Sequence, residues 1–359
     1  MGAGVSVHNC AGAEDMAVGV IGAGGMGARH ADNLHEAIPR ARVGGVTDAD
    51  GSRAEAVAAR CGGAVYRDPL ELIDDDGIDA LVIASPDETH AALALECVRR
   101  RKPVLCEKPL ATNVEDARRI VAAETDLGER LIQVGFMRRY DPQHLAAADA
   151  LAAGTVGRPV LFKGWHRTRR AAPGTTTEFV LFNTAVHDLD AVRWLLRQEI
   201  AEVYVRGVNT DRLLDGVLDL QLIELSTTGG CLATLEIYVT AGYGYEVGVE
   251  LVGERGTVHI APPQAPFVRH EQVRSQRLDG DWLSRFRDAY VAELTRWVRA
   301  VHDGVPPGPD AWDGYASAVA ADACATSLRT GTPARVPDAW DGHGPPALYA
   351  SGRPRNDRA

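Results

Sequence analysis

The sequence predicts two joined architectures: a doubly wound parallel α/β sheet in the first half, and an α+β unit with a mostly antiparallel, open-faced sheet in the second. Three observations support this. Short apolar strands alternate with helices up to residue 136, a glycine-rich turn follows the first strand, and apolar and polar residues alternate from 202 to 260. We therefore expect a flexible leader over 1–15, a first domain over 16–139, a second over 140–331 with helices on one sheet face, and an extended tail over 332–359.

The composition of the 359-residue chain disfavours several classes of function. The net charge is −11, which opposes binding to nucleic acid or to anionic membranes. No run of apolar residues approaches the roughly 20 needed to span a bilayer. The six cysteines are scattered without a C-x-x-C pair, so we expect neither a metal site nor disulfides, and a cytoplasmic location.

A dinucleotide-binding turn is predicted at residues 22–27, between the apolar strand 16–21 and a helix. Its spacing is G-x-G-x-x-G. The first glycine permits the tight turn, the second lets a pyrophosphate approach the backbone, and the third lets the helix pack on the strand. This pattern predicts a Rossmann domain whose cofactor contacts include Gly22, Gly24, Met26 and Gly27.

The preferred cofactor is predicted from the end of the second strand, 42–47. Asp48 follows it, about 20 residues after Gly27, where a carboxylate binds the adenosine ribose and repels a 2′-phosphate. The sequence therefore favours NAD over NADP, although Arg53 nearby could soften this preference. The alternative is that Asp48 only caps a helix or forms a turn.

Two further loops complete the expected binding edge of the sheet. Strand 79–84 and the apolar run 102–105 each end in polar residues, and ligands bind at the carboxyl edge of an open parallel sheet. We expect Ser85, Pro86, His90, Glu107 and Lys108 to contact the cofactor, with Lys108 between cofactor and substrate. The alternative for His90 is that it merely begins the next helix.

The second half supplies the predicted substrate groups. Residues 179–196 are expected to form a helix, or a short entry followed by one. If the helix is continuous, Asn183, His187 and Asp190 lie on one face at i, i+4 and i+7. A lone histidine there could be a satisfied core residue, but Lys108 and the glycine turn favour a catalytic one. A late helix, 313–328, is expected to return to the first domain.

These motifs together resemble the glucose-fructose oxidoreductase/inositol dehydrogenase (Gfo/Idh/MocA) family over residues 16–337. Glu107-Lys108-Pro109 is similar to the lysine motif of that family. Segments 135–141, 243–246 and 313–324 resemble its inositol dehydrogenases. The resemblance implies that Lys108 and His187 are catalytic, with Asn183 as the partner of the histidine. It also implies a cyclitol pocket lined by Arg138, His166, Thr168, Asn183, His187, Tyr243 and Tyr245.

Two positions depart from the pattern of those inositol enzymes. They have a carboxylate where this chain has Asn183, and an asparagine where it has Thr168. An amide can orient an imidazole but cannot stabilise an imidazolium by charge. His187 could therefore be a weaker base here, and the preferred substrate could be a cyclitol other than myo-inositol itself, although Asp190 could partly substitute for the missing carboxylate.

The expected function is NAD-dependent oxidation of a secondary ring alcohol of an inositol or inosamine. Lysine supplies the electrophile, so no metal is required, and the resemblance implies a homotetramer. The actinomycete-like composition suggests, by analogy, aminocyclitol antibiotic biosynthesis. One alternative is a sugar or nucleotide-sugar dehydrogenase or keto-reductase, whose diphosphate would need Arg167, Arg169 and Arg170. Another is a non-catalytic NAD-binding sensor.

Overall fold

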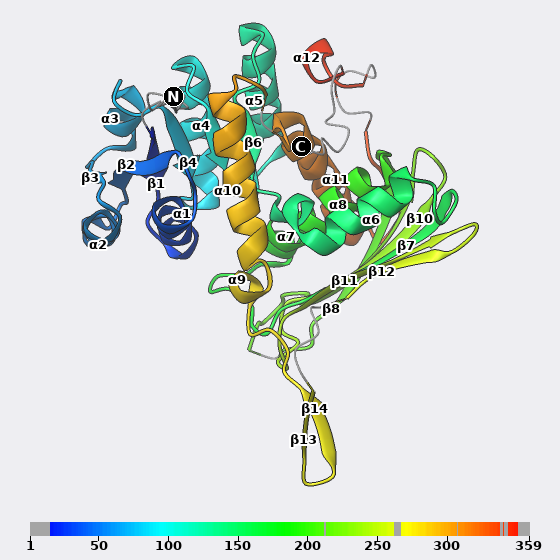
Figure 1. The fold of residues 1–359 in the computed structure, drawn as a ribbon. Helices are drawn as coiled ribbons and strands as arrows, with labels where there is room; N and C mark the ends of the chain where they lie inside the picture. The colour runs from blue at the N-terminus through cyan, green and yellow to red at the C-terminus, as the bar shows by residue number, and fades with distance from the viewer. Residues whose placement is uncertain are drawn as a thin grey trace, which may run out of the picture.

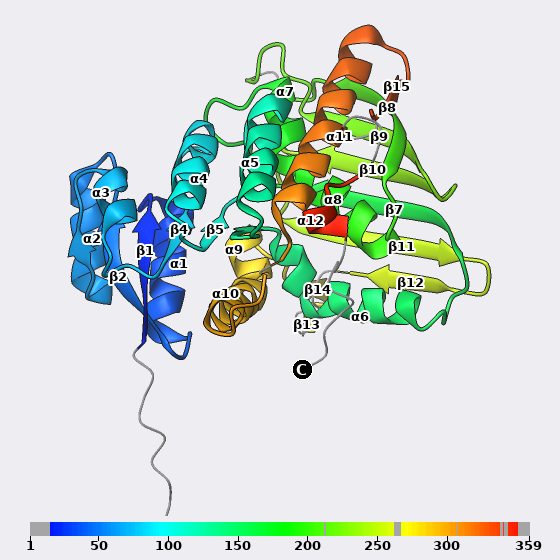
Figure 2. The ribbon, with the colours of Figure 1, turned by 90° about the horizontal axis from the view of Figure 1, so that it is seen from above.

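The computed structural model describes residues 15–211, 213–261, 267–306, 308–337, 340 and 344–350. Two sheets lie side by side, with helices packed between and around them (Figures 1 and 2). Of the expected leader, only residue 15 falls within the described residues. This arrangement confirms the predicted fold class: a parallel α/β sheet followed by a mostly antiparallel sheet with helices.

The first sheet has the strand order β3-β2-β1-β4-β5-β6, and its paired strands are parallel. This is the order of a dinucleotide-binding sheet, whose ligand crevice lies where the order reverses. The strands are β1 (Met16–Ile21), β2 (Ala41–Thr47), β3 (Ala64–Val65), β4 (Ala80–Ile83), β5 (Val104–Cys106) and β6 (Ile132–Val134). The helices are α1 (Gly25–Glu36), α2 (Gly51–Cys61), α3 (Pro69–Asp74), η1 (Asp87–Thr89), α4 (His90–Arg99), α5 (Val114–Leu127) and η2 (Met137–Tyr140).

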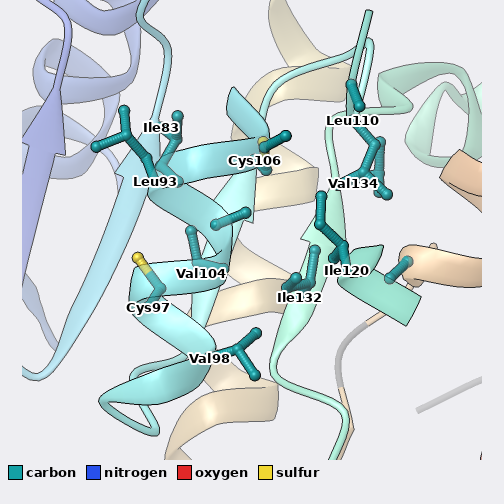
Figure 3. Close-up of a cluster of buried hydrophobic side chains, with 14 of the residues drawn as sticks. Ile83, Leu93, Cys97, Val98, Val104, Cys106, Leu110, Ile120, Ile132 and Val134 are labelled. Carbon is teal, nitrogen blue, oxygen red and sulfur yellow. The ribbon is translucent and has the colours of Figure 1, made fainter. Parts of the chain in front are cut away.

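The central strands of this sheet are apolar along their whole length because helices cover both faces. Figure 3 shows side chains of β4, β5 and β6 packed against α4 and α5. Cys97 and Cys106 are completely buried in this cluster and behave as small apolar residues. Burial raises the pKa of both thiols, so neither is a candidate nucleophile.

The second sheet has the order β12-β11-β7-β10-β9-β8-β15. Only the β7–β10 pair is parallel among the described strand pairs of this sheet. Along β9, Gln221, Ile223 and Leu225 face the helices, whereas Leu222 and Glu224 face outward. The strands are β7 (Pro159–Arg167), β8 (Ile200–Val208), β9 (Leu220–Thr227), β10 (Leu232–Tyr238), β11 (Glu246–Gly253), β12 (Thr257–Ile260) and β15 (Ala334–Arg335). A separate hairpin, β13 (Phe267–His270) with β14 (Val273–Gln276), projects from the body in Figure 1.

The predicted helix 179–196 is interrupted. It consists of α7 (Thr177–Phe179), the π-helical segment η3 (Val180–Ala185) and α8 (Val186–Leu196). A π segment inserts an extra residue into a helical turn and is frequent at functional sites. The remaining helices are α6 (Pro142–Ala152), α9 (Trp282–Arg285), α10 (Arg287–His302), α11 (Ala311–Thr330) and α12 (Ala347–Ala350). Among the described residues, no helix is long and apolar enough to cross a bilayer.

Two late helices pack against the first half of the chain. Leu294, Trp297 and Val298 of α10 belong to the buried cluster formed by β1, β2 and α1. Helix α11 contacts α5 and β6 on one side and β8 and α8 on the other. Figure 2 shows α11 lying between the two sheets. The halves are therefore joined by shared apolar cores.

The tail also contains regular structure. β15 pairs with β8, and Tyr349 of α12 is buried in the core of the first half. The Tyr349 hydroxyl donates to Glu124, which also accepts from the backbone N–H groups of Leu131 and Ile132. Burial raises the pKa of Glu124 to about 7 despite these hydrogen bonds. An aromatic anchor thus orders part of a segment whose composition predicts an extended chain.

Tyr349→Phe is expected to destabilise the protein by about 1–3 kcal/mol, because a buried carboxyl oxygen loses its donor. The hydroxyl favours the charged form of Glu124, so its removal raises the pKa of this carboxyl further. A carboxyl whose pKa is raised on folding contributes stability at low pH that is lost as the pH rises through the folded value, and a further rise in pKa makes this loss larger. The drop in melting temperature should therefore be larger at about pH 8 than at about pH 6.

Tyr66→Phe is the matched control, because its hydroxyl donates to the half-buried carboxylate of Asp75 near the surface. We expect a loss below about 1 kcal/mol that is equal at both pH values. Equal losses for the two variants, measured by calorimetry, would contradict the role assigned to Tyr349.

Candidate active site

The glycine turn has the shape that a dinucleotide needs. Gly22 has φ of +92°, and a Cβ there would lie 2.6 Å from the backbone of Ala84. A Cβ on Gly27 would lie 1.7 Å from the carbonyl oxygen of Gly22, whereas the space above Gly24 is open. α1 begins at this turn without a side-chain cap, so its first N–H groups are available to phosphate oxygens. These features fit NAD, and the turn would hold its pyrophosphate.

The other predicted cofactor residues surround this turn. One carboxylate oxygen of Asp48 accepts from the backbone N–H of Ala23 at 2.6 Å, which holds it beside the turn. Ser85 shares a hydrogen bond with Thr89, and Pro86 is exposed. His90 is buried, with Nδ1 2.7 Å from the Pro109 carbonyl and Nε2 2.9 Å from the Ser85 carbonyl. Its ring therefore ties the two cofactor loops together.

Lys108 lies at the carboxyl end of β5, next to a cis bond to Pro109. Its Nζ donates to the side-chain oxygen of Asn183 at 3.0 Å and to the carbonyl oxygen of Asn183 at 3.1 Å. Burial lowers the pKa of Lys108, and the carboxylates of Glu107 and Asp87 partly offset this effect. Glu107 is itself held 2.7 Å from buried His30. The first sheet thus places the buried ammonium of Lys108 in contact with Asn183 of the second half.

His187 occupies the first turn of α8, close to Lys108. Its Nδ1 has no hydrogen-bond partner among the residues that the structure describes. Burial, together with the positive charges of Lys108 and Arg138, holds the pKa of His187 well below 6.5. The imidazole is therefore neutral at pH 7, as a proton acceptor must be.

A buried ion-pair network stands behind this site. Arg138 donates to Asp188 at 2.6 Å, and Nδ1 of His166 lies 3.0 Å from the same carboxylate. Burial alone would raise the pKa of Asp188, but Arg138 and His166 lower it to about 2. Nε2 of His166 lies 3.2 Å from the Tyr245 hydroxyl, so the network continues from the carboxylate through the imidazole to Tyr245. The network orients His166 and Tyr245 toward the cavity.

These groups enclose a cavity of about 300 Å³ between the two halves. The predicted residues Met26, Glu107, Lys108, His166, Thr168, Asn183, His187 and Tyr245 line it. Besides Arg170, the wall contains residues to which the sequence assigned no role, which are Met137, Ala171, Ala172, Thr175, Phe179, Thr184, Val239, Trp282 and Tyr290. Trp282 and Tyr290 come from α9 and α10, whose apolar residues gave no sign of a ligand site. Among the described residues, no cluster of His, Cys, Asp or Glu side chains is placed to hold a metal ion.

Several predicted residues are not at the cavity wall. Arg138 is buried behind the wall, with a guanidinium nitrogen 3.0 Å from Nδ1 of His166. Tyr243 is 52% exposed, and its hydroxyl donates to Glu246 at the rim of the sheet. Asp190 is paired with Arg139 at 2.5 Å, so the suggestion that it replaces the missing carboxylate beside His187 is wrong. Its carboxylate is occupied by the guanidinium of Arg139.

The arginines at the end of β7 and in the loop after it also differ in whether they reach the cavity. Arg167 is paired with Glu236 at 2.6 Å and with Glu246 at 3.1 Å, whereas Arg170 reaches the cavity wall. Thr168 lines the cavity, but its hydroxyl already donates to the carbonyl of Val239 at 2.9 Å. A diphosphate site built from all three arginines therefore has no support in this geometry.

Comparison with known proteins places these features in a family. Residues 16–136 match the model described as "Oxidoreductase family, NAD-binding Rossmann fold", and residues 149–336 match "Oxidoreductase family, C-terminal alpha/beta domain" of the same Gfo/Idh/MocA family. The chain is 54% identical over 338 residues to the inositol 2-dehydrogenase of Rubrobacter xylanophilus, covering 94% of this chain and 96% of the relative. It is 45% identical over 337 residues to inositol 2-dehydrogenase 1 of Saccharopolyspora erythraea, covering 93% and 99%.

A solved structure is similar over the same extent. The crystal structure of myo-inositol dehydrogenase from Lactobacillus casei, in complex with NAD(H) and myo-inositol, has a TM-score of 0.88 and 34% identity. The match covers 93% of this chain and 99% of that one.

Asp188→Asn is expected to destabilise the protein by about 3–5 kcal/mol, because it leaves the buried Arg138 without a counter-charge. Thermal unfolding measures the effect. Asp116→Asn is the matched control, since Asp116 pairs with Arg119 at 2.9 Å on the surface, and it should cost less than about 1 kcal/mol. Similar melting temperatures for both variants would show that the buried network does not hold the site.

Proposed function

We propose that this chain, which belongs to the Gfo/Idh/MocA oxidoreductase family, oxidises a secondary ring alcohol of a cyclitol such as myo-inositol with NAD as the hydride acceptor. The observation that carries the proposal is the placement of Lys108 and His187 together at one small cavity beside the glycine turn. The names of the relatives, all inositol dehydrogenases, support the substrate class.

The cavity suits a compact, neutral polyol. Its polar wall carries hydrogen-bonding side chains from both halves, and a volume of about 300 Å³ lies at the lower end of small-molecule sites. A nucleotide sugar would need more room and a diphosphate site. Met137, Phe179 and Trp282 form apolar wall, which favours a ring face over a charged group.

The chemistry follows from two side chains. When bound, NAD supplies the nicotinamide carbon that accepts a hydride. Neutral His187 takes the hydroxyl proton, while the hydrogen on the ring carbon leaves with its electron pair as the hydride and the C–O bond becomes the C=O bond of a ketone. Lys108 donates a hydrogen bond to the same oxygen and stabilises the charge that develops there. Asn183 orients the Lys108 ammonium by accepting from it at two oxygens.

The assembly and location are part of the proposal. The outward face of the second sheet exposes Val208, Leu222 and Leu232 on β8, β9 and β10. Covering apolar surface of this kind favours association between copies. We propose a homotetramer in the cytoplasm, and light scattering of the purified protein tests the assembly.

The test of function is NADH formation by the purified protein with NAD and myo-inositol, scyllo-inositol, scyllo-inosamine or glucose, with NADP as a control. Turnover of at least one cyclitol well above that of glucose supports the proposal. Turnover of glucose alone would favour the sugar dehydrogenase. NAD binding without turnover in either direction would favour the sensor.

Lys108→Met is expected to lower kcat by at least about 100-fold, because the developing alkoxide loses its donor. NAD affinity, measured by calorimetric titration, should remain, since the glycine turn is untouched. Turnover close to that of the wild type would overturn the mechanism, whereas loss of NAD binding would show that the lysine serves the cofactor instead.

The pH dependence of kcat/KM is expected to reflect the two shifted groups. His187 must be neutral to act, so activity falls as the pH drops through its pKa, and the acid limb should lie below 6.5. Lys108 must be charged to donate, so activity falls as the pH rises through its pKa, below 10.5. Steady-state rates across the pH range measure both limbs, and an acid limb above 6.5 would contradict the assignment to His187.

A further inference from the structure

Asn183 is contacted from opposite sides by two charged groups. Its Nδ2 donates to the Asp87 carboxylate at 2.8 Å, and its Oδ1 accepts from Lys108 at 3.0 Å. Asp87 begins η1, directly after β4, so the contact joins the first half of the chain to η3 of the second. Nothing in the mechanism so far uses this carboxylate.

We propose that Asp87 is a positioning residue for the reaction: it fixes the Asn183 carboxamide with its oxygen toward Lys108 and supplies negative charge beside that ammonium. The inference rests on the proposed role of Lys108 in oxidation. Asp87, which lies in the loop after β4, thus joins Asn183 as a residue that orients Lys108 toward the substrate.

The orientation of the amide follows from hydrogen-bond chemistry. An ionised carboxylate only accepts and an ammonium only donates. The Asn183 amide therefore has one satisfied orientation, with its NH₂ toward Asp87 and its oxygen toward Lys108. In the reversed orientation, two donors would face each other at Lys108 and two acceptors at Asp87. Without the Asp87 carboxylate, only the lysine would select the orientation.

The charge of Asp87 acts through the amide. The groups that face Lys108 are the carboxylates of Glu107 and Asp87 and the positive or titratable groups Arg138, His166 and His187. Glu107 is already bound to His30 at 2.7 Å. Asp87 is therefore the carboxylate that two hydrogen bonds connect to Lys108 through the neutral amide of Asn183. Its removal should make the Lys108 ammonium easier to deprotonate.

An exchange of the two side chains tests this inference. Asp87→Asn should lower kcat by at least about tenfold, less than loss of the direct donor at Lys108, and should move the basic limb of the pH profile to lower pH. Asn183→Asp places two carboxylates in contact, which forces them to share a proton. The double variant Asp87→Asn with Asn183→Asp keeps one amide and one carboxylate in contact. It should recover kcat to within about threefold of the wild type and restore the basic limb.

Glu88→Gln is the matched control, because Glu88 is the exposed neighbour of Asp87 on η1. It should change neither kcat nor the basic limb. An Asp87→Asn variant that behaves like Glu88→Gln would overturn the inference. So would a double variant as impaired as the sum of the single variants, because Asp87 would then act independently of Asn183.

A second measurement separates this inference from the proposed function. The pH dependence of Lys108 acetylation by acetic anhydride, followed by mass spectrometry of its peptide, reports lysine deprotonation without any substrate. Deprotonation at lower pH in Asp87→Asn than in the wild type is expected, and identical profiles would overturn the inference. If no cyclitol is oxidised but the profiles differ, only the proposed function fails.

Discussion

The positive charge of Lys108, held where the two halves of the molecule meet, is the constraint on which the site depends. An ammonium can leave water only if acceptors and negative charge replace its hydration. Here both oxygens of Asn183 accept from it, and the carboxylates of Glu107 and Asp87 lie close by. The two carboxylates come from the loop after β5 and from η1 in the first half, whereas Asn183 comes from η3, so the set is complete only when the two halves are packed together.

Buried arginine pairs hold that packing in one arrangement. Arg138 of η2 pairs with Asp188 of α8, and Arg139 pairs with Asp190 of α8 and Asp313 of α11. A buried pair adds little net stability, because desolvation offsets the attraction. Breaking one is costly, however, so α8 cannot shift along η2 without leaving a charge unpaired. The position of His187 on α8 is fixed by the charges on the adjacent residue and on Asp190.

The apolar side of the cavity has a different origin. Trp282 and Tyr290 belong to α9 and α10, and α10 continues into the core of the Rossmann half. The same helix therefore seals the site and holds the two halves together. Excluding water from this side strengthens the electrostatic effects of Lys108 and His187 on a bound alcohol.

Much of this molecule was predictable from local patterns. The glycine spacing, the alternation of strands and helices, and the placement of Lys108 after a buried strand all depend on short segments. In a parallel sheet, such segments converge on one edge whatever the rest of the chain does. Lys108 could be selected from the sequence for this reason, whereas His187 was selected from its helical spacing and the family resemblance, and the structure places both at one cavity.

The sequence by itself determined the class of fold and the dinucleotide turn, because each follows from the spacing of residues close together in the chain, whereas the family resemblance pointed to Lys108 and His187 as candidate reactive side chains. The tertiary structure alone decided the partners of those side chains. In the folded chain, Asp190 pairs with Arg139, Tyr243 lies at the surface, His90 lies within hydrogen-bonding distance of backbone carbonyls, and Asp87 accepts from Asn183. These pairings join residues from separate elements, and charge and burial select them only after the elements have packed.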